Sequence, residues 1–313
     1  MPELESATIK HIALYPVKSC GRIELDQAML TKTGLETLSG VPDHGLMIVR
    51  GIPDDQGVHK FITQRDFKSK TSRVEGVVIP AQGFNDLALI KPQLNNEGEL
   101  LLTWDGQQPI LVPSESDPSR ELNVNIWLHT GPAIEVPTLS EWVTDWLNFD
   151  VRVISTTGPW DRMTRQNYLA NNNPVRAQDG YPVHWFSQED LDELSQKAGV
   201  TVPWTRFRPQ IVVEGLPAQS VHQVFEGEIG GIPFVDAKPC DRCQIPQIDQ
   251  DTGEITNIKP LSILKGYKKW VKNDGDIGYI FGENMLPQGE GIIVVGDEVL
   301  VNSHRNPVLA YGT

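Results

Sequence analysis

The chain has 313 residues, 39% apolar and 22% charged, a composition that suits one large globular domain or two smaller ones. Its formal net charge of −14 argues against a general nucleic-acid surface, because phosphate binding needs a basic field. No run of about 18 apolar residues occurs, and residues 1–19 lack a basic-then-apolar leader. We therefore expect a cytoplasmic protein with neither a nucleic-acid nor a membrane partner.

The first half of the chain predicts short strands. Residues 8–15 form a largely apolar run that ends at Pro16, and residues 98–104 follow a turn signal at residues 95–98. Turn residues recur at short intervals and leave no room for βαβ crossovers. This pattern favours a β-rich barrel or sandwich.

Two helices are predicted in the middle of the chain. The apolar residues within 138–147 fall on one helical face, and Thr138 and Glu141 suit a capping box at the start. A second helix is predicted to begin after Ser187 and to stop at Gly199, a residue suited to the left-handed position that follows a helix.

The C-terminal half is mixed but mainly β. Residues 211–213 predict a strand, and residues 291–301 predict two strands broken at Gly296 and Asp297. The helix near the middle could bridge two β-rich units, so we expect a domain boundary within residues 127–150. The predicted fold class is α+β, mainly β with a few helices.

The chain has three cysteines, Cys20, Cys240 and Cys243. So few cysteines in a chain of this length do not form a disulfide framework, and a reducing compartment fits better. Cys20 follows a predicted strand and is interpreted as a small buried apolar residue. Only Cys240 and Cys243 are close in sequence, so chemistry is sought there first.

The Cys-x-x-Cys spacing alone leaves four interpretations open. A structural zinc needs four ligands, and neither the distant Cys20 nor any of the seven histidines lies near the pair. A thioredoxin-like motif needs a helix N-terminus beside a βαβ unit, whereas Pro239 precedes Cys240. The third interpretation is a soft thiolate that binds a transition metal or a metal dithiolene, with Arg242 alongside to stabilise anionic groups. The fourth is an incidental buried pair.

Five segments stand in order along the chain: Tyr15-Pro16-Val17-Lys18-Ser19-Cys20, Phe61-Ile62-Thr63-Gln64-Arg65, residues 206–213, Pro239-Cys240-Asp241-Arg242-Cys243 with residues 249–253, and Phe281-Gly282-Glu283-Asn284 with residues 291–301. Together they resemble the MOSC proteins that carry an N-terminal β-barrel, the group that contains the mitochondrial amidoxime-reducing component. The resemblance spans essentially the whole chain.

The resemblance implies an N-terminal MOSC-type β-barrel domain over residues 1–135 and a MOSC domain over residues 136–313. It also implies a molybdenum cofactor, Mo-molybdopterin, with Cys243 as the catalytic residue and metal ligand; pyridoxal phosphate binding is implied only at the level of the family. The anionic phosphate and dithiolene of the cofactor need cationic and amide donors. The matching candidates are Lys18, Ser19, Arg65, Arg208, Gln210 and Arg242.

The activity implied by the resemblance is reduction of small N-hydroxylated compounds by removal of their oxygen atom at molybdenum. We expect a separate flavin or iron–sulfur reductase as electron donor, and the acidic chain favours a donor with a basic docking face. One alternative is a carrier that delivers molybdenum cofactor or sulfur from Cys243. The other is a binding module without cofactor, because the chain departs from the family pattern at Gln210, where many relatives carry Asn, and at Gln244-Ile245-Pro246.

Overall fold

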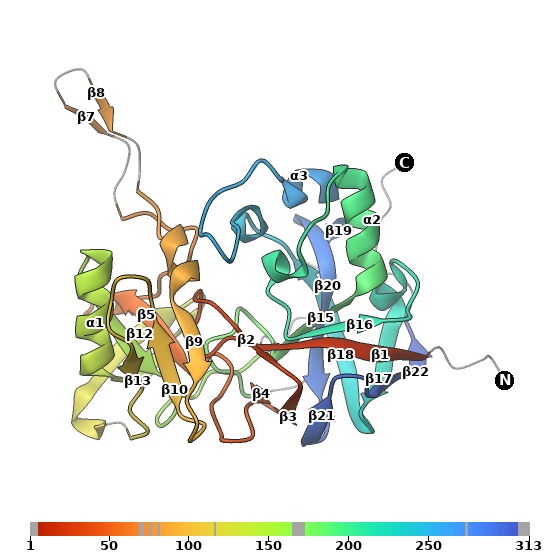
Figure 1. Cartoon of the computed structure of the whole chain (residues 1–313), viewed down its shortest axis with the longest axis horizontal. Helices are drawn as coiled ribbons and strands as arrows, with labels where there is room; N and C mark the ends of the chain where they lie inside the picture. The colour runs from red at the N-terminus through yellow and green to blue at the C-terminus, as the bar shows by residue number, and fades with distance from the viewer. Residues whose placement is uncertain are drawn as a thin grey trace.

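Two β-rich units lie side by side in the computed structural model, which describes residues 6–68, 72–74, 77–79, 82–115, 117–164, 173–272 and 275–305 (Figure 1). One unit carries α1 (Pro137–Leu147), and the other carries α2 (Gln188–Ala198) and α3 (Pro260–Leu264). The predicted fold class, mainly β with a few helices, is confirmed. No helix within these ranges is long and apolar enough to cross a membrane.

The unit on the right of Figure 1 is built on a nine-stranded sheet. Its strands are β1 (Ser6–Leu14), β2 (Ile23–Leu25), β15 (Val183–Ser187), β16 (Ile211–Glu214), β17 (Val224–Ile229), β18 (Ile232–Asp241), β19 (Lys269–Val271), β20 (Ile277–Pro287) and β22 (Glu298–His304). Seven of them follow the order β15-β16-β1-β22-β17-β18-β20, and β15 pairs back to β20. The seven strands therefore close into a barrel.

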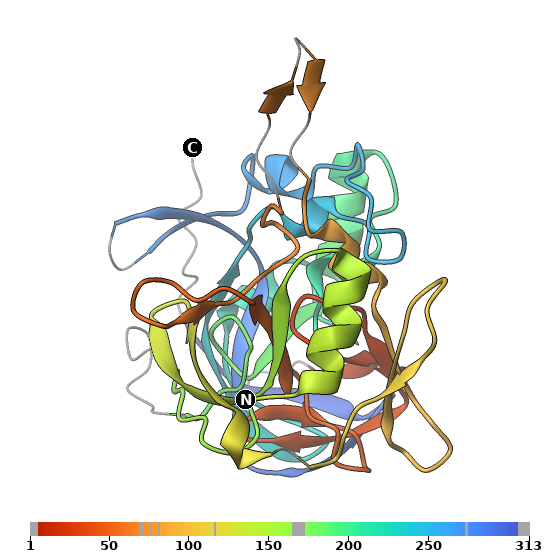
Figure 2. The same ribbon diagram turned by 90° about the vertical axis from the view of Figure 1, so that its left-hand side faces the viewer.

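The other unit is built on the five-stranded sheet β5-β14-β13-β12-β6. Its strands are β5 (Leu46–Arg50), β6 (His59–Lys60), β12 (Glu121–Ile126), β13 (His129–Glu135) and β14 (Val151–Ser155). Figure 2 shows α1 on the outside of this unit, and the helix contacts β14. The buried stripe of α1, formed by Leu139, Val143 and Leu147, joins the core of this sheet.

Short strands and 3₁₀ turns complete the chain. The strands are β3 (Gln27–Thr31), β4 (Gly34–Glu36), β7 (Ser72–Val74), β8 (Val77–Ile79), β9 (Lys91–Leu94), β10 (Leu100–Thr103), β11 (Ile110–Leu111) and β21 (Gly291–Val294). The 3₁₀ turns are η1 (Asn85–Leu89), η2 (Pro118–Arg120), η3 (Trp204–Phe207), η4 (Ser220–Gln223) and η5 (Ile245–Gln247). β21 pairs with β3, so the two ends of the chain meet again outside the barrel.

The first strand of the chain belongs to the barrel of the C-terminal half. β1 pairs with both β16 and β22, and Figure 1 shows it in red among the green and blue strands. Ala7, Ile9 and Ile12 from β1 are buried in the barrel core. Conversely, β14 pairs with β5 and β13 in the other unit. Strand pairing thus crosses the boundary at residues 135 and 136 in both directions, and that boundary stays a prediction.

The predicted strands and the second predicted helix are confirmed. Residues 8–15, 98–104 and 211–213 lie largely in β1, β10 and β16, and residues 291–301 form β21 and part of β22 with a turn between them. α2 begins after Ser187, whose Oγ accepts from the N–H of Asp190 at 3.2 Å. It ends at Gly199 with φ 68°. Both ends therefore follow the capping chemistry of the sequence.

The first predicted helix forms, but its predicted capping box is wrong. α1 starts at Pro137, after Val136 as N-cap, and no side chain caps it. Proline fixes its own φ near the helical value and has no N–H to satisfy, so it can start a helix by itself. Thr138 is therefore already inside the first turn and cannot act as the cap.

A row of charged side chains runs through the buried interior of the barrel unit. Lys268 Nζ donates to Asp190 Oδ1 at 2.7 Å and to His222 Nε2 at 3.0 Å, and His222 Nδ1 donates to Glu283 Oε1 at 2.6 Å. Glu283 Oε2 accepts from Arg305 Nη2 at 2.5 Å. The Asp190, His222, Lys268 and Glu283 side chains are fully buried. Such charges are stable only while each has its partner.

The substitution Lys268→Met should lower the free energy of unfolding by about 3–5 kcal/mol, because it leaves the buried carboxylate of Asp190 without its cation. Urea unfolding at neutral pH measures the loss. Lys197→Met is the matched control, since it removes the partly exposed pair with Glu193 (3.6 Å) and should change stability by less than about 0.5 kcal/mol. Equal losses in the two variants would contradict the importance of the buried row.

Candidate active site

A cleft of about 210 Å³ lies where the two units meet, and Cys240 and Cys243 both line it. Its walls come from the loop after β1, from β15 and the loop before it, from the turn before β16, from the end of β18 and from Asn284 within β20. Six of the seven predicted site residues line this cleft: Lys18, Ser19, Arg208, Gln210, Arg242 and Cys243. Segments almost two hundred residues apart are thus brought together by the barrel.

Lys18 lies on the loop that leaves β1 and is buried, with its side chain 4% exposed. Its Nζ donates to the carbonyl oxygen of Ala177 at 2.8 Å and to Asp179 Oδ1 at 2.5 Å. Burial lowers the pKa of Lys18, whereas the charge of Asp179 raises it. The ammonium group therefore ties the loop before β15 to the loop after β1.

Arg208 is held by neutral acceptors. Its Nη1 donates to the carbonyl oxygen of Cys20 at 2.6 Å and to Gln250 Oε1 at 3.0 Å, and its Cζ lies 4.2 Å from the ring centre of Tyr15. Its Nη2 is buried and has no hydrogen-bond partner in the described part of the chain. One guanidinium donor at the cleft is therefore unused by the protein.

A fully buried carboxylate supports the floor of the cleft. Asp43 Oδ1 accepts from the N–H of Tyr15 at 2.8 Å, and Oδ2 accepts from His44 Nδ1 at 2.6 Å and from Gln210 Nε2 at 3.1 Å. The other end of the Gln210 amide, Oε1, accepts from the N–H of His184 at 2.8 Å. Gln210 is therefore a brace between Asp43 and β15, with hydrogen bonds to protein groups at both ends of its amide.

Arg242 follows β18 and is fixed by three acceptors. Its Nη1 donates to Cys240 Sγ at 2.9 Å and to His184 Nε2 at 3.0 Å, and its Nη2 donates to the carbonyl oxygen of Phe207 at 2.7 Å. Its Nε is buried without a partner among the described residues. Of the two cleft thiols, the guanidinium therefore contacts that of Cys240.

The three thiols differ in their surroundings. Cys20 is fully buried in an apolar core, as predicted, and burial raises its pKa to about 12. Cys240 accepts from Arg242, whereas Cys243 Sγ accepts only from the N–H of Ile245, at 3.5 Å, within the described residues. In the same part of the chain, no three His, Cys, Asp or Glu side chains gather as a metal-binding group.

His184 is a neutral acceptor at the cleft. Its Nδ1 donates to the carbonyl oxygen of Glu283 at 3.1 Å, which leaves Nε2 to accept from Arg242. Burial and the charge of Arg242 lower its pKa to about 3. Gly282 makes room for the ring, because a Cβ there would lie 2.5 Å from His184 Cε1. The imidazole therefore orients the guanidinium.

The backbone of the cleft is strained at three places. Among the described residues, six that are not glycine have a positive φ, and three of these line the cleft: Ser19 (70°), His44 (52°) and Arg208 (51°). Left-handed backbone in such residues is unfavourable and persists only where the surrounding structure enforces it. This concentration of strain is typical of a functional site.

Sequence reasoning placed Arg65 in the site and did not select several polar residues that line the cleft. Arg65 is not among the lining residues, and its Cζ lies 4.8 Å from the ring centre of Trp127. The unselected polar residues include Asp179, His184, Lys238 and Asn284. Asp179 stands in an Asp-Gly-Tyr-Pro turn and Asn284 in the Phe281-Gly282-Glu283-Asn284 segment, which were usable signals, whereas His184 and Lys238 lie in barrel strands and carried none.

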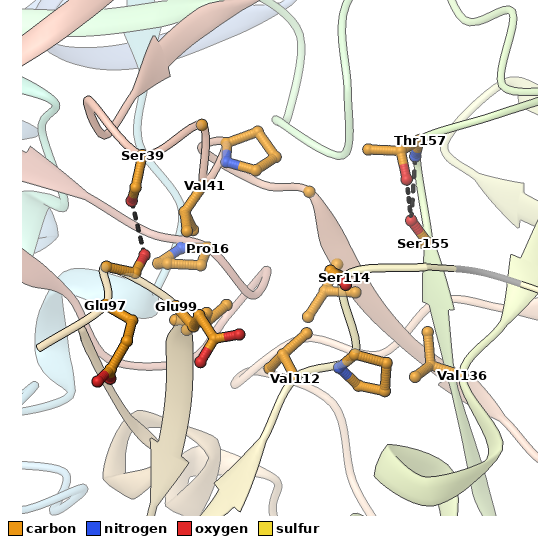
Figure 3. A pocket seen from close by; sticks show the side chains of 17 residues that line it. Pro16, Ser39, Val41, Glu97, Glu99, Val112, Ser114, Val136, Ser155 and Thr157 are labelled. Carbon is orange, nitrogen blue, oxygen red and sulfur yellow. Dashed lines mark hydrogen bonds between the residues drawn. The ribbon is translucent and has the colours of Figure 1, made fainter. Parts of the chain in front are cut away.

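A second cavity, of about 360 Å³, lies beside the five-stranded sheet and is drawn in Figure 3. Apolar side chains such as Val41, Val112 and Val136 line it, together with hydroxyl groups and the carboxylates of Glu97 and Glu99. No thiol or cationic side chain is among its described lining residues. The cysteine cleft is therefore the better candidate for redox or anion chemistry.

Two domain families match this chain. Residues 6–150 match the MOSC N-terminal beta barrel domain, and residues 172–300 match the MOSC domain. The chain belongs to the MOSC family. Lys18 and Ser19 lie in the MOSC N-terminal match and Arg208 and Cys243 in the MOSC match, so both contribute to the cleft. The predicted family resemblance is confirmed.

Two curated relatives are similar to this chain along most of their length, and a third along about a third of its length. Mitochondrial amidoxime reducing component 2 of Rattus norvegicus is 26% identical over 305 residues, which cover 93% of this chain and 82% of the relative. Mitochondrial amidoxime-reducing component 1 of Homo sapiens is 24% identical over 304 residues, with the same coverage. Molybdenum cofactor sulfurase 1 of Aedes aegypti is 25% identical over 270 residues, 82% of this chain but 32% of the relative.

Protonation of His184 should destabilise the fold in acid. Its pKa is about 3 in the fold and 6.5 when unperturbed, so between these values the unfolded chain binds a proton that the folded chain does not. Stability then falls as the pH falls. When the pH falls from 6.5 to about 4.5, the free energy of unfolding measured with urea should fall by about 2 kcal/mol less in His184→Gln than in the wild type. The exposed His304→Gln should follow the wild type, and parallel losses in all three proteins would contradict the assignment.

Proposed function

We propose that this chain is a molybdenum-cofactor-dependent reductase of N-hydroxylated compounds, with Cys243 as the ligand of the metal. Membership of the MOSC family, whose relatives here include amidoxime-reducing components and a molybdenum cofactor sulfurase, supports an association with this cofactor. The observation that carries the proposal is a cleft lined by the thiol of Cys243 and by the guanidinium groups of Arg208 and Arg242, which form no ion pair with a carboxylate of the described residues.

The charges of the cleft fit an anionic group. Arg208 and Arg242 form no ion pair with a carboxylate of the described residues, although the chain carries a formal net charge of −14. By contrast, Lys18 pairs with Asp179, and Asp241 pairs with Lys272 at 2.6 Å. A partly buried cation without a counter-ion is unfavourable unless a bound anion supplies one. The phosphate and dithiolene of molybdopterin are anions of this kind. One guanidinium group can donate two parallel hydrogen bonds to two phosphate oxygens.

Cys243 is the better metal ligand of the two cleft cysteines. Cys240 lies within β18, and its sulfur accepts from Arg242. Cys243 lies beyond the strand end, and its sulfur accepts only the backbone N–H of Ile245 among the described donors. A thiolate that receives a single N–H bond keeps lone pairs for a metal, and such bonds tune the metal's potential. This choice agrees with the family match of the Cys240–Cys243 segment.

The overall reaction takes two electrons and two protons, so that R–NHOH becomes R–NH₂ and water. When bound, the molybdenum cofactor supplies the two-electron chemistry that takes up the oxygen atom. A separate flavin or iron–sulfur reductase supplies the electrons. This chain would hold the pterin with Lys18, Ser19, Arg208 and Arg242. His184 keeps its proton on Nδ1 in a bond to the backbone, so its role is to orient Arg242.

The substitution Cys243→Ser should abolish reduction of benzamidoxime and lower the retained molybdenum by more than roughly tenfold, because an alkoxide is a poor ligand for a soft metal site. The protein is expressed in a host that makes the cofactor. Molybdenum is counted by mass spectrometry, and turnover is followed with an artificial electron donor.

Two cysteine variants serve as controls for this experiment. Cys20→Ala, in the apolar core, should retain both metal and activity at the wild-type level per folded protein. If Cys240→Ser were the only damaging change, the assignment within the pair would be reversed. Retained molybdenum with no turnover, together with transfer to an apo-enzyme, would favour a carrier role instead. Absence of molybdenum from the wild type would leave only the binding module.

A further inference from the structure

The cavity of about 360 Å³ beside the five-stranded sheet has no part in the proposed reaction (Figure 3). Its volume falls in the range of small-molecule sites, roughly 300–1,000 Å³. None of its described lining residues also lines the cysteine cleft. An occupant of this cavity would therefore be a separate ligand, bound apart from the cofactor and the substrate.

The floor of the cavity is aliphatic. Leu46, Leu100 and Val136 line it and are buried in the core of the five-stranded sheet. Val41 and Val112 also line it and pack against the same core. No aromatic side chain is among the lining residues in the described part of the chain. A ligand that removes this aliphatic surface from water would gain free energy, so its body is expected to be a small aliphatic group.

Two loops on one side of the cavity are fixed to each other. Ser39 Oγ donates to the carbonyl oxygen of Gly98 at 2.6 Å. Gly98 has a φ of 79°, and a Cβ there would lie 2.8 Å from Ser39 Cβ, so this close approach requires glycine. The loop of Ser39 is closed by the N–H of Val41, which donates to Thr37 Oγ1 at 2.9 Å. This wall is therefore formed without a ligand.

Two carboxylates stand at the rim of the cavity. Glu97 and Glu99 are exposed and line it, and Figure 3 shows them on one side, opposite Ser155 and Thr157. Asn95 holds their turn, because its Oδ1 accepts from the N–H of Glu97 at 3.0 Å and its Nδ2 donates to Glu99 Oε2 at 2.8 Å. The rim therefore presents negative charge at a fixed place.

No cation of the described residues balances this charge. Neither Glu97 nor Glu99 forms an ion pair there, and the described lining residues include no Lys, Arg or His. Exposed carboxylates are common on an acidic chain, but these two border an aliphatic cavity of the size of a small molecule. The charge of the rim thus complements a ligand that carries a cation on an aliphatic body.

We propose that this cavity binds a small aliphatic ammonium ion. Its alkyl body contacts Leu46, Leu100 and Val136, and its ammonium group donates to the carboxylates of Glu97 and Glu99. The inference is independent of the proposed function, because no residue of the cysteine cleft takes part in it.

The test titrates cyclohexylammonium into the purified full-length protein, labelled with nitrogen-15, at neutral pH. Cyclohexanol is the uncharged probe of similar shape. Cyclohexylammonium should cause saturable shifts of the backbone amide signals of Gly40, Gly45 and Gly98, which line the cavity, and leave that of Gly180 in the cleft unchanged. Cyclohexanol should bind roughly threefold to tenfold more weakly, because only the ammonium ion gains the two exposed carboxylates.

Substitutions at the rim separate the contribution of charge from that of shape. Glu97→Gln and Glu99→Gln should each raise the Kd for cyclohexylammonium by roughly threefold, and the double variant by roughly tenfold, with the Kd for cyclohexanol unchanged. Glu115→Gln is the matched control, since Glu115 is exposed and follows the lining residue Ser114 but does not line the cavity. It should change neither Kd.

Three results would overturn the proposal: no saturable shift at the three glycines of the cavity, equal Kd values for the two probes, or an equal loss of affinity in Glu115→Gln and the rim variants. Shifts confined to Gly180 would place the probe in the cleft and would also overturn it. Turnover is not measured in this experiment, so its outcome is distinguishable from a failure of the reductase assay.

Discussion

The arrangement of this protein depends on one pairing, the insertion of β1 between β16 and β22. A barrel strand must satisfy its backbone groups on both sides, so the first strand of the chain closes a barrel otherwise made by residues 183–304. The chain leaves β1 at Tyr15 and immediately forms the loop of Lys18 and Ser19. Arg208 precedes β16, the direct neighbour of β1. The two sides of the cleft are therefore placed by the same hydrogen-bond ladder, and neither half of the chain could form the site alone.

Charge is treated in opposite ways in two buried regions of the same barrel. In the row from Asp190 to Arg305 each ionised group has an opposite charge beside it, so the row is complete without a ligand. In the cleft, Arg208 and Arg242 bond to neutral acceptors and each keeps a buried nitrogen without a partner. Desolvation penalises both regions, but only the first is compensated by the protein itself. This difference marks the cleft as a place for an anion in a chain that is strongly acidic overall.

Local sequence patterns predicted the helices and strands, whereas long-range strand pairing determined which side chains reach the cleft. Ser187 and Gly199 bounded a helix correctly because caps depend on neighbouring residues. The ordered motifs led to six residues that line the cleft. His184 gave no local signal, since it reaches the cleft only because β15 and β20 close the barrel. Arg65 belonged to a motif, yet its contact with Trp127 depends on a left-handed turn that no sequence pattern indicated.

The departure at Gln210 has a structural meaning that the sequence did not provide. The amide of Gln210 spans from Asp43 Oδ2 to the backbone N–H of His184 and is satisfied at both ends by protein groups. A shorter Asn at this position would have one methylene less with which to span the same two partners. The Gln210 side chain holds the backbone of His184, and the imidazole of His184 in turn accepts from the guanidinium of Arg242, which also donates to Cys240. The departure therefore alters how the cationic wall is supported while leaving its charges in place.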